Sequence, residues 1–411
     1  MKNRLFILGL ILSFGIVFTS CNDDDDDETI VEVPVEDNVV EVTDNISADQ
    51  TWYSDSIYQL GGRISVLDGA TLTIEAGTII KGEAGTGANA TALLVARGGM
   101  LMAEGTAAAP IIFTSVADEI QPEDVAAGNF ASPNLDPDQN GLWGGVIVLG
   151  KAHISAQNDN DQDVSEIQIE GIPTSDPNGL YGGSDDADNS GVIKYISIRH
   201  GGSNIGQGNE INGLTLGGVG SGTTVENIEV VANQDDGIEW FGGTVDVSNV
   251  VVWNPGDDGL DTDQAWNGTC SNFIVVTPNG SLFELDGPEG SYINGNHSFD
   301  QGVGYAGDLG EELIDFDGST NVDMSNIYFF GVATEDIVVE EYADMAANGG
   351  SVSNFEYTLP DSVSAQAVFL DIPADKLTEV ADPSGKSVGP TASDFAWTWA
   401  GQSGALAGIG L

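Results

Sequence analysis

The residues Val225-Glu226-Asn227-Ile228-Glu229-Val230 begin a pattern that the chain repeats twice more before Gly287. The equivalent segments are Val247-Ser248-Asn249-Val250-Val251-Val252 and Cys270-Ser271-Asn272-Phe273-Ile274-Val275. Asn227, Asn249 and Asn272 occupy the same place in the three segments, so the repeat is short and nearly constant in length. A repeat of this kind, in a sequence rich in glycine and β-branched residues, is typical of stacked coils. Two short alternating segments fill each repeat, with no helical pattern between them, so the sequence predicts a parallel β-helix.

The second segment of each repeat places acidic side chains on one face. These segments are Asp235-Asp236-Gly237-Ile238-Glu239-Trp240-Phe241, Asp257-Asp258-Gly259-Leu260-Asp261-Thr262-Asp263 and Ser281-Leu282-Phe283-Glu284-Leu285-Asp286. Because side chains alternate across a strand, the apolar positions should point inward and the acidic ones outward. The residues expected on the outward face are Glu239, Asp261 and Glu284, with Asp263 and Asp286 beside them.

Coils in such a stack are about 4.8 Å apart, so these carboxylates should form a row. Two carboxylates at that spacing repel by about 3 kcal/mol at an effective dielectric constant near 20. A bound calcium ion or raised pKa values would relieve the repulsion, and calcium prefers clustered oxygen ligands. We therefore expect calcium at Glu239, Asp261, Asp263, Glu284 and Asp286. The alternative is a solvated acidic face that keeps the protein soluble.

Composition restricts the class of protein. The chain has 411 residues with 55 glycines and little helical periodicity, which indicates an all-β protein. Its formal charge is -55, from 65 acidic and 10 basic residues. Such a charge excludes non-specific nucleic-acid binding and adhesion to anionic lipid through a basic patch, since both need clustered Lys and Arg.

Residues 1–20 are typical of a lipoprotein signal peptide. Basic residues precede the apolar run Leu5–Val17, and Phe18-Thr19-Ser20-Cys21 resembles a lipobox, in which the cysteine is lipidated. A transmembrane anchor is the weaker alternative, because the apolar run is short and five aspartates follow soon after it. We expect a lipid on Cys21 and an acidic tether over residues 21–48.

Residues 49–371 are predicted to form the β-helix and residues 372–411 a C-terminal cap. Polar insertions are expected to leave the stack at residues 117–140, 157–165 and 174–190. The alternating stretch Phe395-Ala396-Trp397-Thr398-Trp399 is expected to cover the open edge of the last coil.

Asparagines recur at one position of the repeat. A hydrogen-bonded ladder at a corner of the coils is predicted for Asn227, Asn249, Asn272, Asn326 and Asn354. The long gap between Asn272 and Asn326 is interpreted as room for an insertion containing His297 and Tyr305.

Further motifs complete the pattern. They are Gly69-Ala70-Thr71-Leu72-Thr73-Ile74, Gly77-Thr78-Ile79-Ile80-Lys81-Gly82, Gly141-Leu142-Trp143-Gly144-Gly145, Asn212-Gly213-Leu214-Thr215-Leu216-Gly217-Gly218-Val219-Gly220, Asp235-Asp236-Gly237-Ile238-Glu239-Trp240-Phe241-Gly242-Gly243 and Phe395-Ala396-Trp397-Thr398-Trp399. With these motifs the chain resembles a family of β-helix surface lipoproteins from the Bacteroidetes. The resemblance implies a right-handed, single-stranded parallel β-helix of the pectate-lyase type. The segment Asn22-Asp23-Asp24-Asp25-Asp26-Asp27-Glu28 resembles the acidic export signal of such lipoproteins, so we expect a lipid-anchored protein on the outer face of the outer membrane, with a solvated spacer as the alternative for this segment. The family resemblance implies no activity.

The first functional hypothesis is non-catalytic binding of a carbohydrate or another surface ligand, assisted by calcium. Trp253 and Trp266 lie close to the acidic row in sequence and are candidates for stacking on a sugar ring. The alternative for both tryptophans is that they pack in turns.

Two other hypotheses remain. A glycoside hydrolase would use two carboxylates, and a polysaccharide lyase would use a cation with a base. The residues considered for these roles, and for ligand binding in general, are Asp235, Asp236, Asp257, Asp258, Arg199 and His200. Asp-Asp-Gly is also ordinary turn chemistry. The third possibility is a structural component of a surface layer, which would need no pocket.

Overall fold

The computed structural model describes residues 38–205, 210–307 and 309–411. The predicted signal peptide, Cys21 and most of the predicted tether lie outside these residues. Within the described part, no helix has the length and apolar character needed to cross a membrane.

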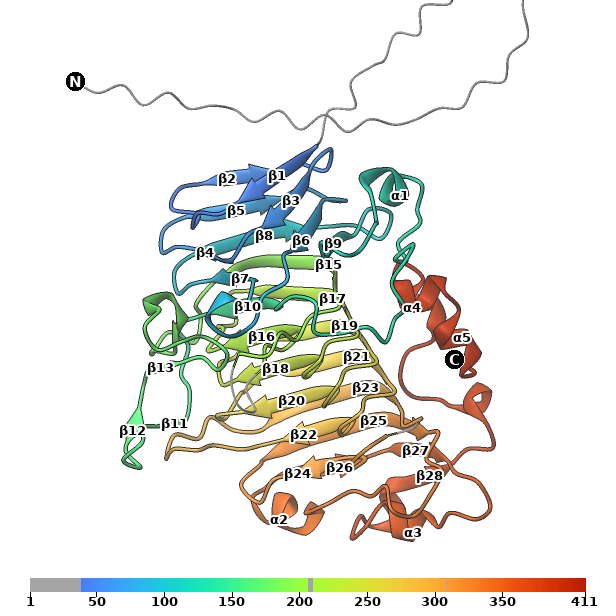
Figure 1. Cartoon of the computed structure of the whole chain (residues 1–411). Coiled ribbons are helices and arrows are strands. Elements are labelled where there is room, and N and C mark those ends of the chain that lie inside the picture. The colour runs from blue at the N-terminus through green and yellow to red at the C-terminus, as the bar shows by residue number, and fades with distance from the viewer. Residues whose placement is uncertain (1–37, 206–209, 308) are drawn as a thin grey trace, which may run out of the picture. The chain divides into compact units, whose positions relative to one another are not determined.

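The described chain winds into stacked coils with three sides (Figure 1). A 16-stranded sheet forms the first and second sides and an 8-stranded sheet the third, and neighbouring strands in both are parallel. The predicted all-β parallel β-helix is thereby confirmed.

The strands on each side are as follows. The first side contains β2 (Gln50–Trp52), β5 (Thr71–Ile74), β8 (Met100–Glu104) and β26 (Ser351–Ser353). The second contains β1 (Val39–Val42), β3 (Ile57–Leu60), β6 (Ile79–Gly82), β9 (Ile111–Ser115), β27 (Phe355–Thr358) and β28 (Leu377–Glu379). Long strands bend and span both sides: β15 (Gly191–Arg199), β17 (Thr224–Val231), β19 (Val247–Trp253), β21 (Thr269–Val276), β23 (His297–Tyr305) and β25 (Val322–Phe330). The third side contains β4 (Arg63–Val66), β7 (Ala92–Val95), β10 (Val146–Leu149), β16 (Leu214–Gly217), β18 (Ile238–Phe241), β20 (Leu260–Asp263), β22 (Phe283–Leu285) and β24 (Asp315–Phe316).

Helices and small hairpins lie outside the coils. The α-helices are α1 (Pro122–Ala126), α2 (Tyr342–Ala347), α3 (Ala365–Val368), α4 (Trp399–Gln402) and α5 (Ala405–Gly408). Short 3-10 turns occur at Gly87–Asn89, Pro177–Gly179, Ala374–Lys376, Pro383–Gly385 and Ala392–Phe395. Two antiparallel pairs join β11 (Ala156–Gln157) to β12 (Asp163–Val164) and β13 (Ile167–Gln168) to β14 (Leu180–Tyr181).

The β-helix extends beyond its predicted limits at both ends. β1 begins at Val39 and pairs with β3, so strand structure starts inside the range predicted to be a tether. β28 ends at Glu379 and pairs with β27, inside the range predicted to be a cap.

The bend between the first and second sides is made by a residue in the left-handed conformation. Asn249 and Asn272 have φ of 59° and 60°, a region that Asn tolerates better than most residues. Asn272 Nδ2 donates to Asn249 Oδ1 at 2.6 Å, and Asn354 Nδ2 donates to Asn326 Oδ1 at 2.7 Å. The predicted ladder is confirmed for these two pairs.

β23 occupies part of the stretch interpreted above as an insertion, and that interpretation was wrong. His297–Tyr305 pairs with β21 on one side and β25 on the other, so it is a regular part of a coil. Gln301, with φ of 59°, stands at the bend where the two neighbouring coils have Asn272 and Asn326. The presence of Gln in place of Asn hid this coil in the sequence.

The C-terminal segment packs along the second side of the coils. The prediction that residues 395–399 cover the open edge of the last coil was therefore wrong. Phe395, Trp399 and Leu406 join a buried apolar cluster with outward residues of β17, β19 and β21. Those strands carry apolar side chains on both faces, for example Val251 and Val252. A sheet face of this kind needs a cover. Gln402 Nε2 also donates to Gly128 O, in the insertion that contains α1, at 2.9 Å.

Candidate functional site

Carboxylates line the outward face of the third side, as the alternation predicted. In the parallel register Glu239 pairs with Asp261, and Asp261 with Glu284. The row continues to Asp315, which pairs with Glu284 and was not predicted. The side chains at the inward positions belong to the core. For example, the Trp240 ring stacks on the Trp266 ring, with 4.7 Å between the centroids.

The centre of this row is buried. Glu239 is 6 % exposed and Asp261 8 %, so the solvated acidic face that was the alternative does not describe them. Asn212, in the segment before β16, is 3 % exposed, and its Nδ2 donates to Glu239 Oε2. Nearby on the same side, Tyr181 of β14 is also buried and donates its hydroxyl to Gln264 Oε1 at 2.6 Å.

A third carboxylate joins these two from the preceding turn. One oxygen each of Asp236, Glu239 and Asp261 lies within 4.8 Å of the others, and all three residues are buried. Asp236 Oδ1 also accepts a hydrogen bond from the backbone of Asp258 at 3.0 Å, which fixes its direction. We call these three residues the carboxylate triad.

The triad is a strong electrostatic conflict when it is fully ionised. At an effective dielectric constant near 20, two charges 4.8 Å apart repel by about 3.5 kcal/mol. Within the described residues, no ion pair links a basic side chain to any member of the triad. A cation or retained protons must therefore balance the charge.

Without a bound cation, the carboxyl groups of the triad tend to keep their protons. Burial, together with the facing carboxylates, raises the pKa of Asp236, Glu239 and Asp261 well above the ordinary range. The same two causes raise the pKa of Asp235 to about 7 and that of Asp257 to about 6.

Carboxylates continue from the triad along the turns that lead from the second side into the third. Asp235 and Asp257 lie on adjacent turns and form a group with Asp236. Asp257 and Asp258 form another group with Glu311, which precedes β24. Glu311 was not predicted, because it lies in an irregular segment outside the repeat. The four aspartates considered as ligand or catalytic residues are thus brought together.

The remaining predicted metal ligands are placed differently. Asp263 and Asp286 do not belong to any of the groups of three carboxylates found among the described residues. Desolvation of its carboxyl group, followed by the nearby Asp317, raises the pKa of Asp286 to about 6. Glu284 pairs in register with Asp261 of the triad, and burial together with its hydrogen bond to Asp258 raises its pKa to about 9.

Neither tryptophan proposed for sugar stacking is available to a ligand. Trp266 lies in the core, stacked on Trp240. Trp253 points outward on the second side, but Trp399 covers it edge-on at 5.8 Å between ring centroids. The prediction of exposed stacking surfaces was wrong, and the alternative of packed tryptophans is correct.

Arg199 and His200 are also fully buried, so their assignment as ligand-binding residues was wrong. The Arg199 guanidinium carbon lies 5.0 Å from the Trp399 ring centroid, and Arg199 Nε donates to Ser197 Oγ at 2.7 Å. His200 Nδ1 contacts the backbone oxygen of Gln139. The C-terminal segment and the insertion ending at residue 140 cover both side chains, which the sequence repeat alone does not reveal.

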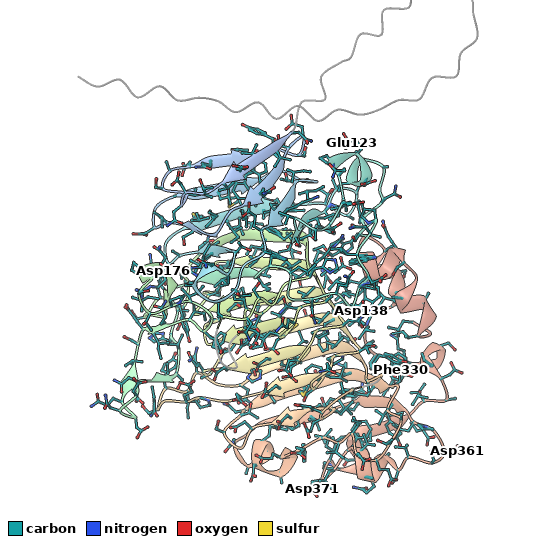
Figure 2. All side chains as sticks on the ribbon, viewed as in Figure 1. Glu123, Asp138, Asp176, Phe330, Asp361 and Asp371 are labelled. Atoms are coloured by element: carbon teal, nitrogen blue, oxygen red, sulfur yellow. The ribbon has the colours of Figure 1, made fainter. Side chains whose placement is uncertain are left out.

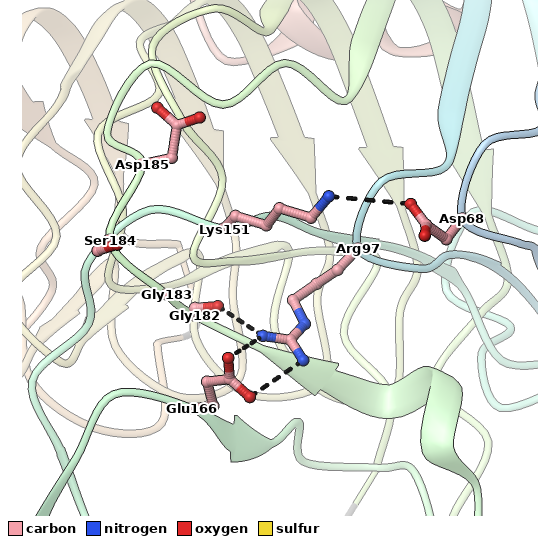
Figure 3. A pocket seen from close by; sticks show the side chains of 8 residues that line it. All are labelled: Asp68, Arg97, Lys151, Glu166, Gly182, Gly183, Ser184 and Asp185. Atoms are coloured by element: carbon pink, nitrogen blue, oxygen red, sulfur yellow. Dashed lines mark hydrogen bonds and ion pairs between the residues drawn. The ribbon is translucent and has the colours of Figure 1, made fainter.

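A polar pocket of about 450 Å³ lies at the other end of the third side, where the coils return to the first side (Figure 3). Arg97 donates from Nη1 to Gly182 O at 2.8 Å and pairs with Glu166 at 2.8 Å. Lys151 Nζ faces Asp68 Oδ1 at 3.9 Å. Since each cation already has an acidic partner, this pocket does not favour an anionic ligand.

Comparison with known proteins identifies the fold family. A family model described as a pectate-lyase like beta helix domain matches residues 44–128 and 130–305, which include the triad. No curated protein and no solved structure matches the chain.

Proposed function

Since the chain belongs to the pectate-lyase-like β-helix family, we propose that it is a non-catalytic recognition protein that binds carbohydrate with the help of calcium. Fold alone does not assign this function, because the same architecture serves many activities. In this proposal the protein is held at the cell surface by a lipid on Cys21.

The carboxylate triad is the observation that supports the cation site. Three buried carboxylates within 4.8 Å of one another, without a basic partner among the described residues, offer a cation several oxygen ligands. The side-chain amide of Asn212 contacts the triad, because its Nδ2 donates to Glu239 Oε2. Flipping that amide, which exchanges its oxygen and nitrogen, would direct Oδ1 toward Glu239 and provide a further oxygen ligand.

The ligand set favours calcium over transition metals. Asp236, Glu239, Asp261 and Asn212 are all oxygen donors, whereas zinc and copper prefer sites with imidazole or thiolate ligands. Calcium also accepts irregular sets of six to eight oxygens more readily than magnesium does.

One observation favours a second candidate, a glycoside hydrolase. Asp235 and Asp257 lie on adjacent turns, and their pKa values of about 7 and about 6 fall near those of a general acid and base. Release of reducing ends from a panel of glycans by the native protein would establish the hydrolase and reject the binding role. A product absorbing in the unsaturated-uronate band would establish a lyase instead.

Isothermal titration with calcium chloride tests the cation site. We expect calcium uptake by the native protein, and an affinity lowered by about tenfold or more in Glu239→Gln and Asp261→Asn. Asp361→Asn is the matched control, because Asp361 is exposed and lies near the last strands (Figure 2). A native protein that takes up no calcium would reject the proposal. A glycan array with and without calcium then tests the recognition role.

A further inference from the structure

From the geometry of the turns beside the triad we infer that one pocket is a subsite for a neutral sugar residue. This inference rests on the proposed function and locates the carbohydrate that it requires. The pocket lies between the end of the insertion 117–140 and three successive turns that join the second side to the third.

The pocket has a volume of about 480 Å³, within the range of small-molecule sites. Its polar side chains come from Asp138, Asn140, Gln234, Asn254, Thr277 and Asn279. Asp138 is one of the residues that Figure 2 labels, beside the stacked strands. Segments that are far apart in sequence therefore build one cavity.

Several lining amides are held in place by the protein. Asn254 Nδ2 donates to Pro137 O at 3.0 Å, which also ties the turn to the insertion. Asn279 Nδ2 donates to Gly256 O at 3.1 Å. Each bond uses an N–H and leaves the carbonyl oxygen of the same amide as an acceptor. Amides fixed before binding lose less conformational freedom when a ligand arrives.

Gln234 provides the complementary donors. Its side chain is exposed and forms no hydrogen bond to another residue within the described part of the chain. The pocket thus combines fixed acceptors, a free amide and the Thr277 hydroxyl. Neighbouring hydroxyl groups of a sugar both donate and accept, so they match a lining of amides and hydroxyls.

Charge selects a neutral sugar over an acidic one. The lining includes no Lys, Arg or His, and its one ionisable side chain is Asp138. The next residue after the pocket-lining Gly256 is Asp257, a member of the carboxylate groups. With a net charge of -55, the protein repels uronates and sulfated sugars, whereas a neutral hexose or N-acetylhexosamine is not repelled.

One turn connects the pocket to the cation site, because the backbone N–H of Asp258 in this turn donates to Asp236 of the triad at 3.0 Å. Asn254 and Gly256 line the pocket, and Asp257 and Asp258 of the same turn belong to the carboxylate groups. A cation that orders this turn should therefore strengthen sugar binding, and by linkage the sugar should strengthen cation binding.

The test is titration of the protein with neutral oligosaccharides (manno-, gluco-, xylo- and N-acetylgluco-oligomers) and with oligogalacturonate, in calcium and in EDTA. We expect a neutral oligomer to bind, and the double variant Gln234→Ala/Asn279→Ala to bind it about tenfold more weakly, since two hydrogen bonds are removed. Gln366→Ala, at an exposed position in α3, is the control. Thermal unfolding of each variant verifies that it folds.

The outcomes separate this inference from the proposed function. Unchanged sugar affinity in the double variant, a preference for oligogalacturonate, or no binding of any neutral oligomer would each overturn the sugar subsite. Calcium uptake is measured on the same samples, so the cation site stands or fails independently. Sugar binding that depends on Gln234 and Asn279 but is unaffected by EDTA would support the subsite and remove its link to the cation.

Discussion

At the scale of single residues, burial gives the acidic side chains their chemistry. Glu239 and Asp261 would be ordinary surface carboxylates if the third side faced water. In the fold both are almost inaccessible, and Asp236 from the preceding turn and Asn212 from the preceding coil lie against them. A carboxylate in this environment either keeps its proton or binds a cation, because the low dielectric constant penalises an isolated charge.

The raised pKa values predict how stability depends on pH. A carboxyl whose pKa is higher in the folded state stabilises the fold at low pH and loses that contribution as pH rises through the folded value. The pKa is about 6 for Asp257, about 7 for Asp235 and about 9 for Glu284. In EDTA, we therefore expect the free energy of unfolding to fall as the pH rises from 5 to 9.

Urea unfolding at several pH values measures this slope. Each proton held only by the folded state contributes about 1.4 kcal/mol per pH unit. Calcium should flatten the slope, because a cation replaces the protons. Stability in EDTA that rises over the same range would show that these carboxylates are ionised without a cation.

At the scale of elements, the C-terminal segment is a lateral cover for the second side. Its α4 packs Trp399 against Trp253 and over Arg199, and the backbone of Ala400 donates to Glu229 Oε1 at 2.9 Å. Glu229 and Arg199 are both fully buried, so the cover also seals a polar pair away from water.

Removing the Trp399 side chain should destabilise the protein strongly. Loss of a buried tryptophan commonly costs about 3–5 kcal/mol, and here it would also admit water to Arg199. We expect Trp399→Ala to lower the free energy of urea unfolding by this amount. Tyr53→Ala, which removes an aromatic side chain that is 52 % exposed, should change it by less than about 0.5 kcal/mol. Equal effects of the two substitutions would contradict the role of the cover.

At the scale of the whole molecule, the net charge of -55 makes cations part of the energetics of folding. Self-repulsion destabilises a compact chain, and salt screens it in a way that does not depend on the kind of cation. A specific site adds a contribution that depends on the ion and is saturable.

A chelator should therefore lower the thermal midpoint. When free calcium is 100 times its dissociation constant, a single site stabilises the native state by about 2.7 kcal/mol. We expect EDTA to lower the midpoint measured by scanning calorimetry and added calcium to restore it. Sodium chloride of equal ionic strength is the control. If sodium chloride restored the midpoint as well as calcium does, the effect would be general screening and not a specific site.

The coils and the carboxylate row were predictable from the sequence alone. The regular recurrence of Asn227, Asn249 and Asn272 sets the stack, and the alternation along each strand sets which side chains point outward. Both are local properties, since adjacent coils are adjacent in sequence. They sufficed for Glu239, Asp261 and Glu284, but not for β23, where Gln301 replaces the asparagine.

Which outward residues are accessible depends on contacts between distant segments, and the sequence pattern does not reveal them. Trp253 and Arg199 lie beneath the C-terminal segment, which comes much later in the chain, and the sugar pocket needs the insertion that ends at Asn140. Asp236 was visible in sequence as a turn residue, but its approach to Glu239 and Asp261 depends on how that turn folds over the third side. These contacts join segments that no repeat relates. The physical reason is that an apolar or acidic sheet face requires a cover or a counterion, and the periodicity of a strand does not specify which distant segment provides it.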